Sequence, residues 1–219
     1  MRCIKEVKVM AKPNINYQIE MENILKSLEH REKLLLHSCC GPCSTAVIER
    51  LVKYFDITVY YYNPCTAPYE EYEKRKAEQI KVIESWRENG INIDYAESGY
   101  FHDDFLLLTS GRENDREGGY RCRLCYEQRL RGTAEYAKGH GFMWFCSTLT
   151  VSPYKNATIL NELGSAIAKE NGLKYLLSDF KKKEGYKRSI VLSGDLNLYR
   201  QEYCGCEYSL RDATLKGNG

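Results

Sequence analysis

The sequence predicts an α/β protein whose parallel sheet is covered by helices on both faces. Short runs of β-branched, aromatic or aliphatic residues alternate with longer segments of helical periodicity along most of the 219 residues. A strand, a tight turn and a helix begin this pattern near residue 33, as in nucleotide-binding α/β units. Repeated alternation of this kind requires crossover connections, which place parallel strands side by side.

The elements follow in order along the chain. Residues 1–30 are expected to form an N-terminal helical extension, with a loosely helical period over 14–28, and residues 214–219 a tail. Between them, residues 31–213 are expected to form a single α/β domain that binds metal and carries the catalytic site. Strands are predicted at 33–37, 56–62, 91–95, 142–147 and 174–177, and helices at 46–55, 68–88, 124–138 and 154–170.

Composition limits the class of protein. Hydrophobic residues make up 43% of the chain and charged residues 28%, which is typical of a globular protein. The sequence lacks an apolar run of the roughly 20 residues that a membrane-spanning helix needs, and its first residues do not resemble a secretory signal. We therefore expect a cytoplasmic protein with no membrane partner. A net charge of +2 neither demands nor excludes a nucleic-acid partner.

Cysteine content is the most informative part of the composition. A cytoplasmic chain with ten cysteines points to metal or redox chemistry rather than to structural disulfides. Seven of them form three groups: Cys39, Cys40 and Cys43; Cys122 and Cys125; Cys204 and Cys206. The first group lies where a strand meets a helix N-terminus, which stabilises thiolates. Of the three single cysteines, Cys3 and Cys146 are expected to be buried apolar residues, and the role of Cys65 stays open.

The number of thiols leaves several kinds of site open. Four ligands close a structural zinc site, and three or four suit an iron–sulfur cubane, with the remainder free to hold a second metal. A dithiol exchange site is a further alternative. The chain contains neither GxGxxG nor GxxxxGK[ST], so an ATP or nicotinamide site is not expected at the first strand-to-helix turn.

Several ordered motifs resemble the epoxyqueuosine reductases of the QueH type. The matching stretches extend from about residue 14 to residue 210: Asn16-Tyr17-Gln18, Leu36 to Cys43, Tyr62-Asn63-Pro64, Glu117 to Cys125, Ser147 to Asn156, Asp179 to Lys183, Tyr199-Arg200-Gln201 and Tyr203 to Cys206. Cys65 departs from the family pattern, in which asparagine is expected.

The resemblance implies a Rossmann-like three-layer fold related to the adenine-nucleotide α-hydrolases, with the metal site at the C-terminal edge of the strands. It also implies a 4Fe–4S cluster, a second metal ion expected to be iron, and no cobalamin. The implied reaction reduces epoxyqueuosine to queuosine at the wobble position of tRNA, the last step of queuosine biosynthesis. The epoxide oxygen leaves as water, at the expense of two protons and two electrons from an external donor such as a ferredoxin or flavodoxin.

Site residues follow from the same motifs. The seven grouped cysteines correspond to the metal ligands, with their division between the two centres left open. Asp179, His37 and Tyr154 are candidate proton donors. Each also has a structural alternative: Asp179 could cap a turn, His37 could be a hydrogen-bonded histidine at the end of a strand, and Tyr154 could simply pack against its neighbours. The candidate substrate-binding residues, which could equally be ordinary surface or charge-balancing residues, are Arg121, Lys181, Lys182, Lys183 and Tyr62.

Other functions remain possible at this point. A zinc-stabilised RNA-binding protein without catalysis would use the same cysteines. Another iron–sulfur redox enzyme, such as a heterodisulfide-reductase-like protein, would also contain Cys-Cys-Gly, but its cysteines are expected closer together than Cys40 and Cys122. A tRNA thiolase of the same fold group is disfavoured because the glycine-rich phosphate loop is missing.

Overall fold

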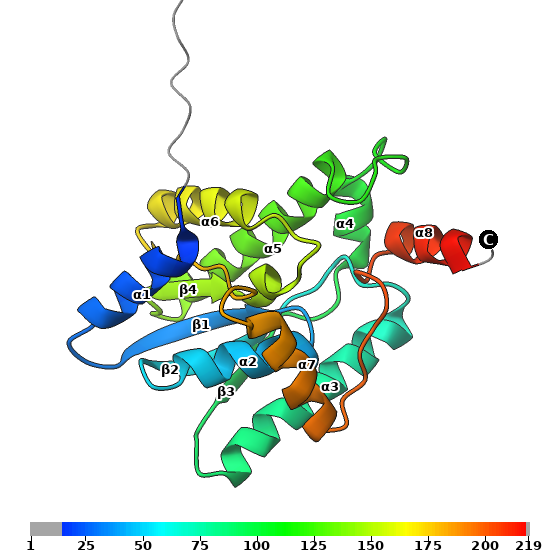
Figure 1. The fold of residues 1–219 in the computed structure, drawn as a ribbon. Coiled ribbons are helices and arrows are strands. Elements are labelled where there is room, and N and C mark those ends of the chain that lie inside the picture. Colours follow the sequence, from blue (N-terminus) through cyan, green and yellow to red (C-terminus); the bar gives the residue numbers. More distant parts are fainter. Residues whose placement is uncertain (1–14, 218–219) are drawn as a thin grey trace, which may run out of the picture.

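A five-stranded parallel sheet forms the centre of the computed structural model, which describes residues 15–217 (Figure 1). The strand order is β3-β2-β1-β4-β5, and every neighbouring pair is parallel. The strands are β1 (Glu32–Ser38), β2 (Phe55–Tyr61), β3 (Asp94–Glu97), β4 (Trp144–Ser147) and β5 (Lys174–Tyr175). This is the order of the first five strands of a doubly wound fold, and its parallel strands agree with the predicted fold class.

Helices cover the sheet in two groups (Figure 1). In one group, α2 (Gly41–Leu51) packs against α3 (Tyr69–Glu88) and α7 (Gly185–Asp195), and in the other α5 (Tyr120–Gly139) packs against α6 (Ala157–Asn171). The remaining helical segments are α1 (Tyr17–Ser27), α4 (His102–Leu108), the 3₁₀ turn η1 (Thr148–Val151) and α8 (Glu207–Gly217). No described helix is both long and apolar enough to cross a membrane.

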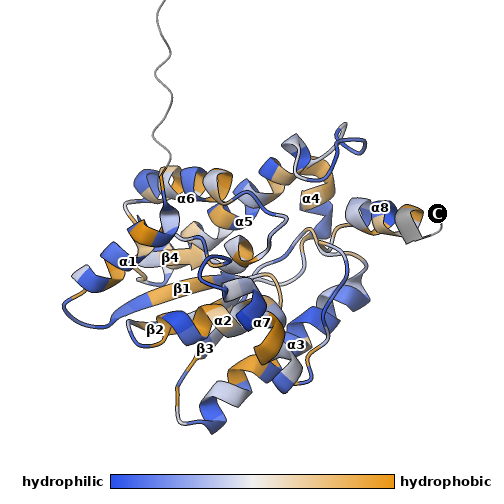
Figure 2. Ribbon diagram, viewed as in Figure 1, coloured by the Kyte–Doolittle hydropathy of each residue, from blue (hydrophilic) through white to orange (hydrophobic). Residues whose placement is uncertain are grey.

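Local sequence explains where several helices begin and end. The side chains of Asn16 and Asn156 accept hydrogen bonds from free N–H groups at the starts of α1 and α6. Gly172 ends α6 in the left-handed conformation that glycine adopts without strain. The last five residues of β1 are buried, as expected for a central strand with both faces covered. Figure 2 shows β1 apolar over much of its length and the flanking helices with mixed apolar and polar residues.

Several predicted boundaries need correction. β3 begins at Asp94 rather than at residue 91, because the Ile91 N–H and the Ile93 carbonyl are hydrogen-bonded to the end of α3. β4 likewise begins at Trp144, since the Phe142 N–H bonds to Ala137 at the end of α5. Helix α5 begins earlier than predicted, which places the CxxC motif inside the helix. Residues 214–217, expected in a tail, belong to α8.

The order of the strands determines where a site can form. The chain leaves β1 toward β2 on one side and returns to β4 on the other, so the carboxyl ends of β1 and β4 form the topological switch point. Ligands of doubly wound folds bind in the crevice at this position. Cys39 follows β1 directly, and its backbone N–H lies 3.4 Å from Thr148 Oγ1, just after β4. The first cysteine group therefore lies at the switch point. Cys3 lies outside the described residues.

Candidate metal centre

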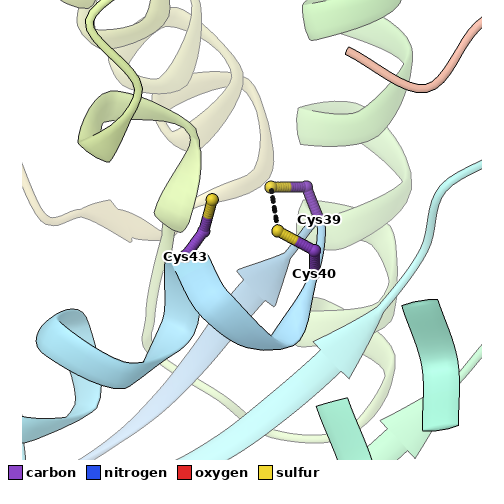
Figure 3. Close-up of side chains that lie close together, drawn as sticks. All are labelled: Cys39, Cys40 and Cys43. Atoms are coloured by element: carbon purple, nitrogen blue, oxygen red, sulfur yellow. Dashed lines mark hydrogen bonds between the residues drawn. The ribbon is translucent and has the colours of Figure 1, made fainter. Parts of the chain in front are cut away.

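Three sulfur atoms gather at the carboxyl end of β1 (Figure 3). Cys39, Cys40 and Cys43 have all of their Sγ atoms within 4.8 Å of one another, and Cys39 Sγ lies 3.8 Å from Cys40 Sγ. Cys39 and Cys40 are buried and Cys43 is half-buried. Because α2 begins at Gly41, its free N–H groups and the positive end of its dipole face this group and favour thiolates. Three convergent sulfurs can hold a thiophilic metal.

Buried polar contacts fix the turn that carries these sulfurs. Ser38 Oγ donates to Gln79 Oε1 at 2.6 Å, and Asn63 Nδ2 donates to the Ser38 carbonyl at 2.9 Å. Gln201 Nε2 lies 3.1 Å from Cys40 Sγ and donates to it. A Cβ atom at Gly41 would lie 2.5 Å from the Glu78 carbonyl oxygen, so only glycine permits this approach of α2 to α3.

The other two cysteine groups meet in a small neighbouring cavity. Its lining includes Cys122 and Cys125 from α5, and Cys204 and Cys206 from the segment before α8. Cys122 lies in the first turn of α5 and accepts a hydrogen bond from the Gly118 N–H at 3.2 Å. Cys206 directly precedes α8. Each of the three predicted cysteine groups thus lies at the N-terminus of a different helix, where the helix dipole favours negative charge.

Two buried or half-buried cations balance the thiols. The Arg129 side chain is 2% exposed, and its Nη2 lies 3.2 Å from Cys125 Sγ. Lys155 is half-buried in the cavity wall beside Cys39 and Cys43. Within residues 15–217, no carboxylate forms an ion pair with either side chain. A buried charge is costly unless it is paired, so the thiolates are the counter-charge of these cations.

The charges alter the acidity of the thiols and of the cations. Hydrogen bonds from Cys40 and Cys43, reinforced by Lys155 and Arg129, hold the pKa of Cys39 well below its usual value. Burial alone would lower the pKa of Lys155, but Cys204 and Cys39 raise it above its usual value. The lysine therefore stays protonated at neutral pH beside the sulfurs. This donor set fits a cysteine-ligated metal.

A larger cavity opens beside the first cysteine group. It has a volume of about 380 Å³, which lies within the range of about 300–1,000 Å³ for small-molecule sites. Cys39, Cys43 and Cys204 lie in its wall together with polar and aromatic side chains, among them Tyr154, Lys155, Tyr186, Arg200, Gln201 and Tyr203. The sulfurs are thus accessible to a bound molecule of the size of a nucleoside.

Of the three candidate proton donors, His37 is placed worst for this role. It is fully buried, with Nδ1 2.8 Å from Ser147 Oγ and Nε2 3.0 Å from the Tyr62 carbonyl. Burial, together with the nearby charge of Arg129, lowers the pKa of His37 to about 4. The ring is therefore neutral at physiological pH and both of its nitrogens are in use. His37 is thus placed as a hydrogen-bonded histidine near the end of β1, which was the structural alternative for this residue.

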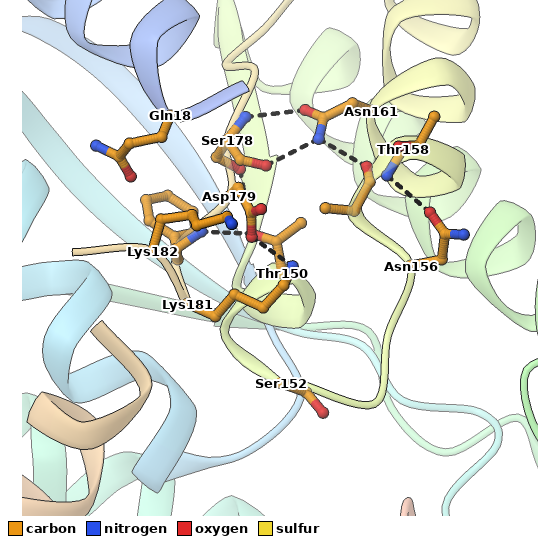
Figure 4. A network of polar contacts seen from close by, with 12 residues as sticks. Gln18, Thr150, Ser152, Asn156, Thr158, Asn161, Ser178, Asp179, Lys181 and Lys182 are labelled. Carbon is orange, nitrogen blue, oxygen red and sulfur yellow. Dashed lines mark hydrogen bonds and ion pairs between the residues drawn. The ribbon is translucent and has the colours of Figure 1, made fainter. Parts of the chain in front are cut away.

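Asp179 lies in a different polar network (Figure 4). Its carboxylate accepts a hydrogen bond from Lys181 Nζ at 2.5 Å, and its carbonyl accepts one from the Lys182 N–H. Neighbouring Ser178 is bound through both its N–H and its carbonyl to the side chain of Asn161. Asp179 does not line either of the two cysteine-containing cavities. It holds a turn, as its structural alternative states.

The remaining candidates differ in exposure. Tyr154 is 80% exposed at the rim of the larger cavity and so does not pack in the core. Tyr62 lines a groove beside α4 and α5 instead of a cysteine-containing cavity. Arg121 is 2% exposed, and its Nη1 donates to the carbonyls of Arg112 and Glu113. A guanidinium held in this way cannot contact a tRNA phosphate without rearrangement.

The lysine run is only partly available to a substrate. Lys181 pairs with Asp179, and Lys183 pairs with Glu22 on α1. Lys182 is exposed and forms no ion pair with a described carboxylate.

Sequence reasoning did not single out Lys155 and Gln201 as site residues. Both lie in motifs of the family resemblance, and this was the signal that could have found them. The two residues contact or face sulfur only after distant segments meet at the switch point. Cys65 also joins the site, since it lines the small cavity beside Cys125.

The fold and the site together define a doubly wound α/β protein with a group of cysteines that could hold a metal ion. Comparison with known proteins then identifies the family. The family model "Epoxyqueuosine reductase QueH" matches residues 34–212, and the chain belongs to this family of oxidoreductases.

Curated relatives match over most of their length. An epoxyqueuosine reductase QueH of Staphylococcus aureus is 40% identical over 209 residues, which cover 93% of this chain and 87% of the relative. The protein of the same name from Streptococcus pyogenes is 39% identical, with 95% and 84% covered. That of Thermotoga maritima is 32% identical, with 84% and 93% covered. The family expected from the sequence is confirmed.

Proposed function

We propose that this chain reduces epoxyqueuosine to queuosine at the wobble position of tRNA, in the cytoplasm and without cobalamin. The observation that carries the proposal is the convergence of the sulfurs of Cys39, Cys40 and Cys43, of which Cys39 and Cys43 line a nucleoside-sized cavity. The family and the relatives' names support the reaction. The proposed cofactors are a 4Fe–4S cluster and a second metal ion, iron, and the seven grouped cysteines are their proposed ligands. When bound, these groups supply single electrons and a Lewis acid.

The protein's own residues would orient the modified base. Bases of unpaired RNA are recognised by stacking on aromatic and arginine side chains, and Tyr154, Tyr186, Tyr203 and Arg200 supply such groups in the cavity. Tyr154 is the candidate proton donor that we retain, since its side chain lies at this cavity whereas those of His37 and Asp179 do not. Lys155 keeps a positive charge next to the sulfurs.

The reaction needs partners outside the cavity. A ferredoxin or flavodoxin is proposed as the external donor of the two electrons. The tRNA backbone would be contacted by exposed cations, of which Lys182 is the best placed among the three predicted lysines. Such a contact gives an affinity that falls as salt concentration rises.

Anaerobic purification followed by iron and sulfide analysis, and then an assay on epoxyqueuosine-containing tRNA, tests the proposal. We expect a brown protein with more iron than sulfide that forms queuosine when a reductant is supplied. Cys43→Ala should lose metal and activity, whereas Cys146→Ala, a buried strand cysteine away from both cavities, should keep both. A colourless, zinc-containing chain that binds tRNA without converting it would refute the proposal and favour the RNA-binding alternative.

A further inference from the structure

Lys155, in the wall of the larger cavity, is a half-buried cation. Its backbone is fixed, because the Lys155 N–H donates to the Ser152 carbonyl at 3.3 Å and the side chain of the next residue, Asn156, caps α6. Among residues 15–217, no group accepts a hydrogen bond from Lys155 Nζ and no carboxylate pairs with it. Nor is Nζ one of the described polar atoms that are sealed inside the protein without a partner. The ammonium is therefore open to the cavity.

Of the three described cations in the cavity wall, Lys155 has the most donors available. Arg129 donates from Nε to the Cys125 carbonyl at 3.3 Å and from Nη2 to Cys125 Sγ at 3.2 Å. Arg200 Nη1 donates to two groups on α7, at 3.1 Å and 2.8 Å. A guanidinium that is anchored in this way supports the wall. An ammonium with three N–H donors and no protein acceptor can instead bind an atom of a ligand.

The exposure of two neighbouring residues gives the cavity a direction. Tyr154 is 80% exposed at the rim, and Lys155 is half-buried beside Cys39 and Cys43. A molecule that contacts both Tyr154 and Lys155 therefore extends from solvent toward the sulfurs. Unpaired bases stack on aromatic side chains, so the base of a bound nucleoside would lie at Tyr154. The ring that carries the epoxide would then lie further in, beside Lys155.

The epoxide oxygen is the atom of the substrate that needs a cation. It is neutral in the substrate and gains negative charge as its C–O bonds break. The sulfurs of Cys39 and Cys43 cannot compensate this charge, and as thiolates they would oppose it. Lys155 stays positively charged at neutral pH. A fixed donor that faces a developing negative charge is worth more in a cavity than in water.

We propose that Lys155 is a catalytic residue whose ammonium donates a hydrogen bond to the epoxide oxygen of the substrate and stabilises the negative charge that develops there. The inference rests on the proposed function, because that reaction supplies the epoxide. It adds a donor from the protein itself to the metal chemistry. It also assigns Tyr154 and Lys155 to opposite ends of the bound nucleoside.

The atoms and electrons of the reaction balance without a change in Lys155. Two electrons from the proposed ferredoxin or flavodoxin reduce the two epoxide carbons, both C–O bonds break, and a carbon–carbon double bond forms. The oxygen takes up two protons, which come ultimately from solvent, and leaves as water. Lys155 keeps its own proton and its charge throughout.

Binding of two anticodon stem–loop RNAs that differ by one oxygen atom tests this inference. One RNA carries epoxyqueuosine and the other queuosine, and fluorescence anisotropy at fixed salt, without a reductant, gives both dissociation constants. Loss of one hydrogen bond typically changes an affinity by about two- to tenfold. In Lys155→Met the ratio of the two dissociation constants should shift by this factor against the epoxyqueuosine RNA, and Lys155→Arg, which keeps the charge, should shift it less. The control Lys182→Met should weaken both RNAs equally, because a phosphate contact does not distinguish them.

Single-turnover conversion of the epoxyqueuosine RNA by the iron-loaded, reduced chain measures the catalytic effect. The rate should fall about 100- to 1,000-fold in Lys155→Met, as is typical when one donor to a developing negative charge is removed. The binding ratio is measured for both the iron-loaded and the metal-free chain, so that a variant that loses iron is still tested. If Lys155→Met leaves this ratio unchanged in both forms, Lys155 only balances the charge of the sulfurs and the inference is wrong.

The same measurements separate this inference from the proposed function. A parent chain that converts the RNA, but whose binding ratio does not depend on Lys155, refutes only the inference. A parent chain that does not convert the RNA when iron and a reductant are supplied, but whose binding ratio depends on Lys155, refutes only the function.

Discussion

Removal of the Arg129 charge should weaken metal binding. In the metal-free protein it should also remove the free-energy cost of burying an unpaired guanidinium. The perturbation is Arg129→Gln, which keeps a polar side chain in the buried position. Arg129 Nη2 lies 3.2 Å from Cys125 Sγ. At an effective dielectric constant of about 20, the Coulomb energy at this separation is about 5 kcal/mol. An opposite charge this close typically lowers a pKa by about 1–3 units, or about 1.4–4 kcal/mol.

The direction of the effect follows from proton release. Thiols bind metal as thiolates, so a higher thiol pKa in Arg129→Gln makes the metal compete with more protons. The pH at which half of the metal is lost on acidification should therefore rise, by about 1 unit or more. In the metal-free chain at low pH the thiols are neutral and leave the buried guanidinium unpaired. There the substitution should cost little stability or even increase it.

Chelator competition for zinc at several pH values, together with thermal unfolding of both forms, measures these quantities. Arg131→Gln is a matched control on the same helix, since Arg131 is partly exposed and pairs with Glu127 and Glu170. The control should shift stability by about 1 kcal/mol or less and leave the pH of metal loss unchanged. If Arg129→Gln destabilises both forms equally and does not move the pH of metal loss, Arg129 is only a packing residue and the charge argument is wrong.

Two further predictions concern the strand end and the turn. Gly41→Ala places a Cβ atom 2.5 Å from the Glu78 carbonyl oxygen, so the free energy of unfolding should fall by about 1–3 kcal/mol. In the control Gly139→Ala the new Cβ atom meets no atom within 4 Å, and the free energy of unfolding should be unchanged or higher. Burial lowers the pKa of His37 to about 4, so the folded protein holds this histidine in its neutral form. The resulting contribution to the free energy of unfolding, about 3 kcal/mol, is fully present above pH 6.5 and is lost as the pH falls toward 4. His37→Gln should flatten this part of the acid-unfolding curve, and an unchanged curve would contradict the low pKa.

The parallel sheet and the edge that carries the first cysteine group could be predicted from the sequence, because both depend on patterns local to each segment. Alternation of strands and helices implies parallel pairing, and a cysteine directly after a buried strand must lie at its carboxyl edge. The exact strand starts could not be predicted, since Ile91 and Phe142 look like strand residues. Their backbone groups bind to preceding helix ends instead.

Distant contacts limited the prediction of individual site residues. His37 follows a strand beside a cysteine group, and only the structure shows that Ser147 and the Tyr62 carbonyl occupy its two nitrogens. Lys155 lies in a motif of the family resemblance, and Cys65 in a loop after a strand, but neither position shows by itself that the side chain faces the other cysteines. Their role depends on which segments meet at the switch point, and this is a property of the fold rather than of any short motif.

The proposed sulfur ligands are far apart in the sequence, from Cys39 just after the first strand to Cys206 before the last described helix. This separation sets the order of events during protein synthesis. At about 5–20 residues per second, on the order of 10 to 30 s passes between translation of the first group and of the last. Throughout that interval the early thiols lack their partners. The proposed set of ligands can therefore be completed only after Cys204 and Cys206 have been synthesised, and a nascent chain that stalls before Cys204 would lack two of the seven proposed ligands.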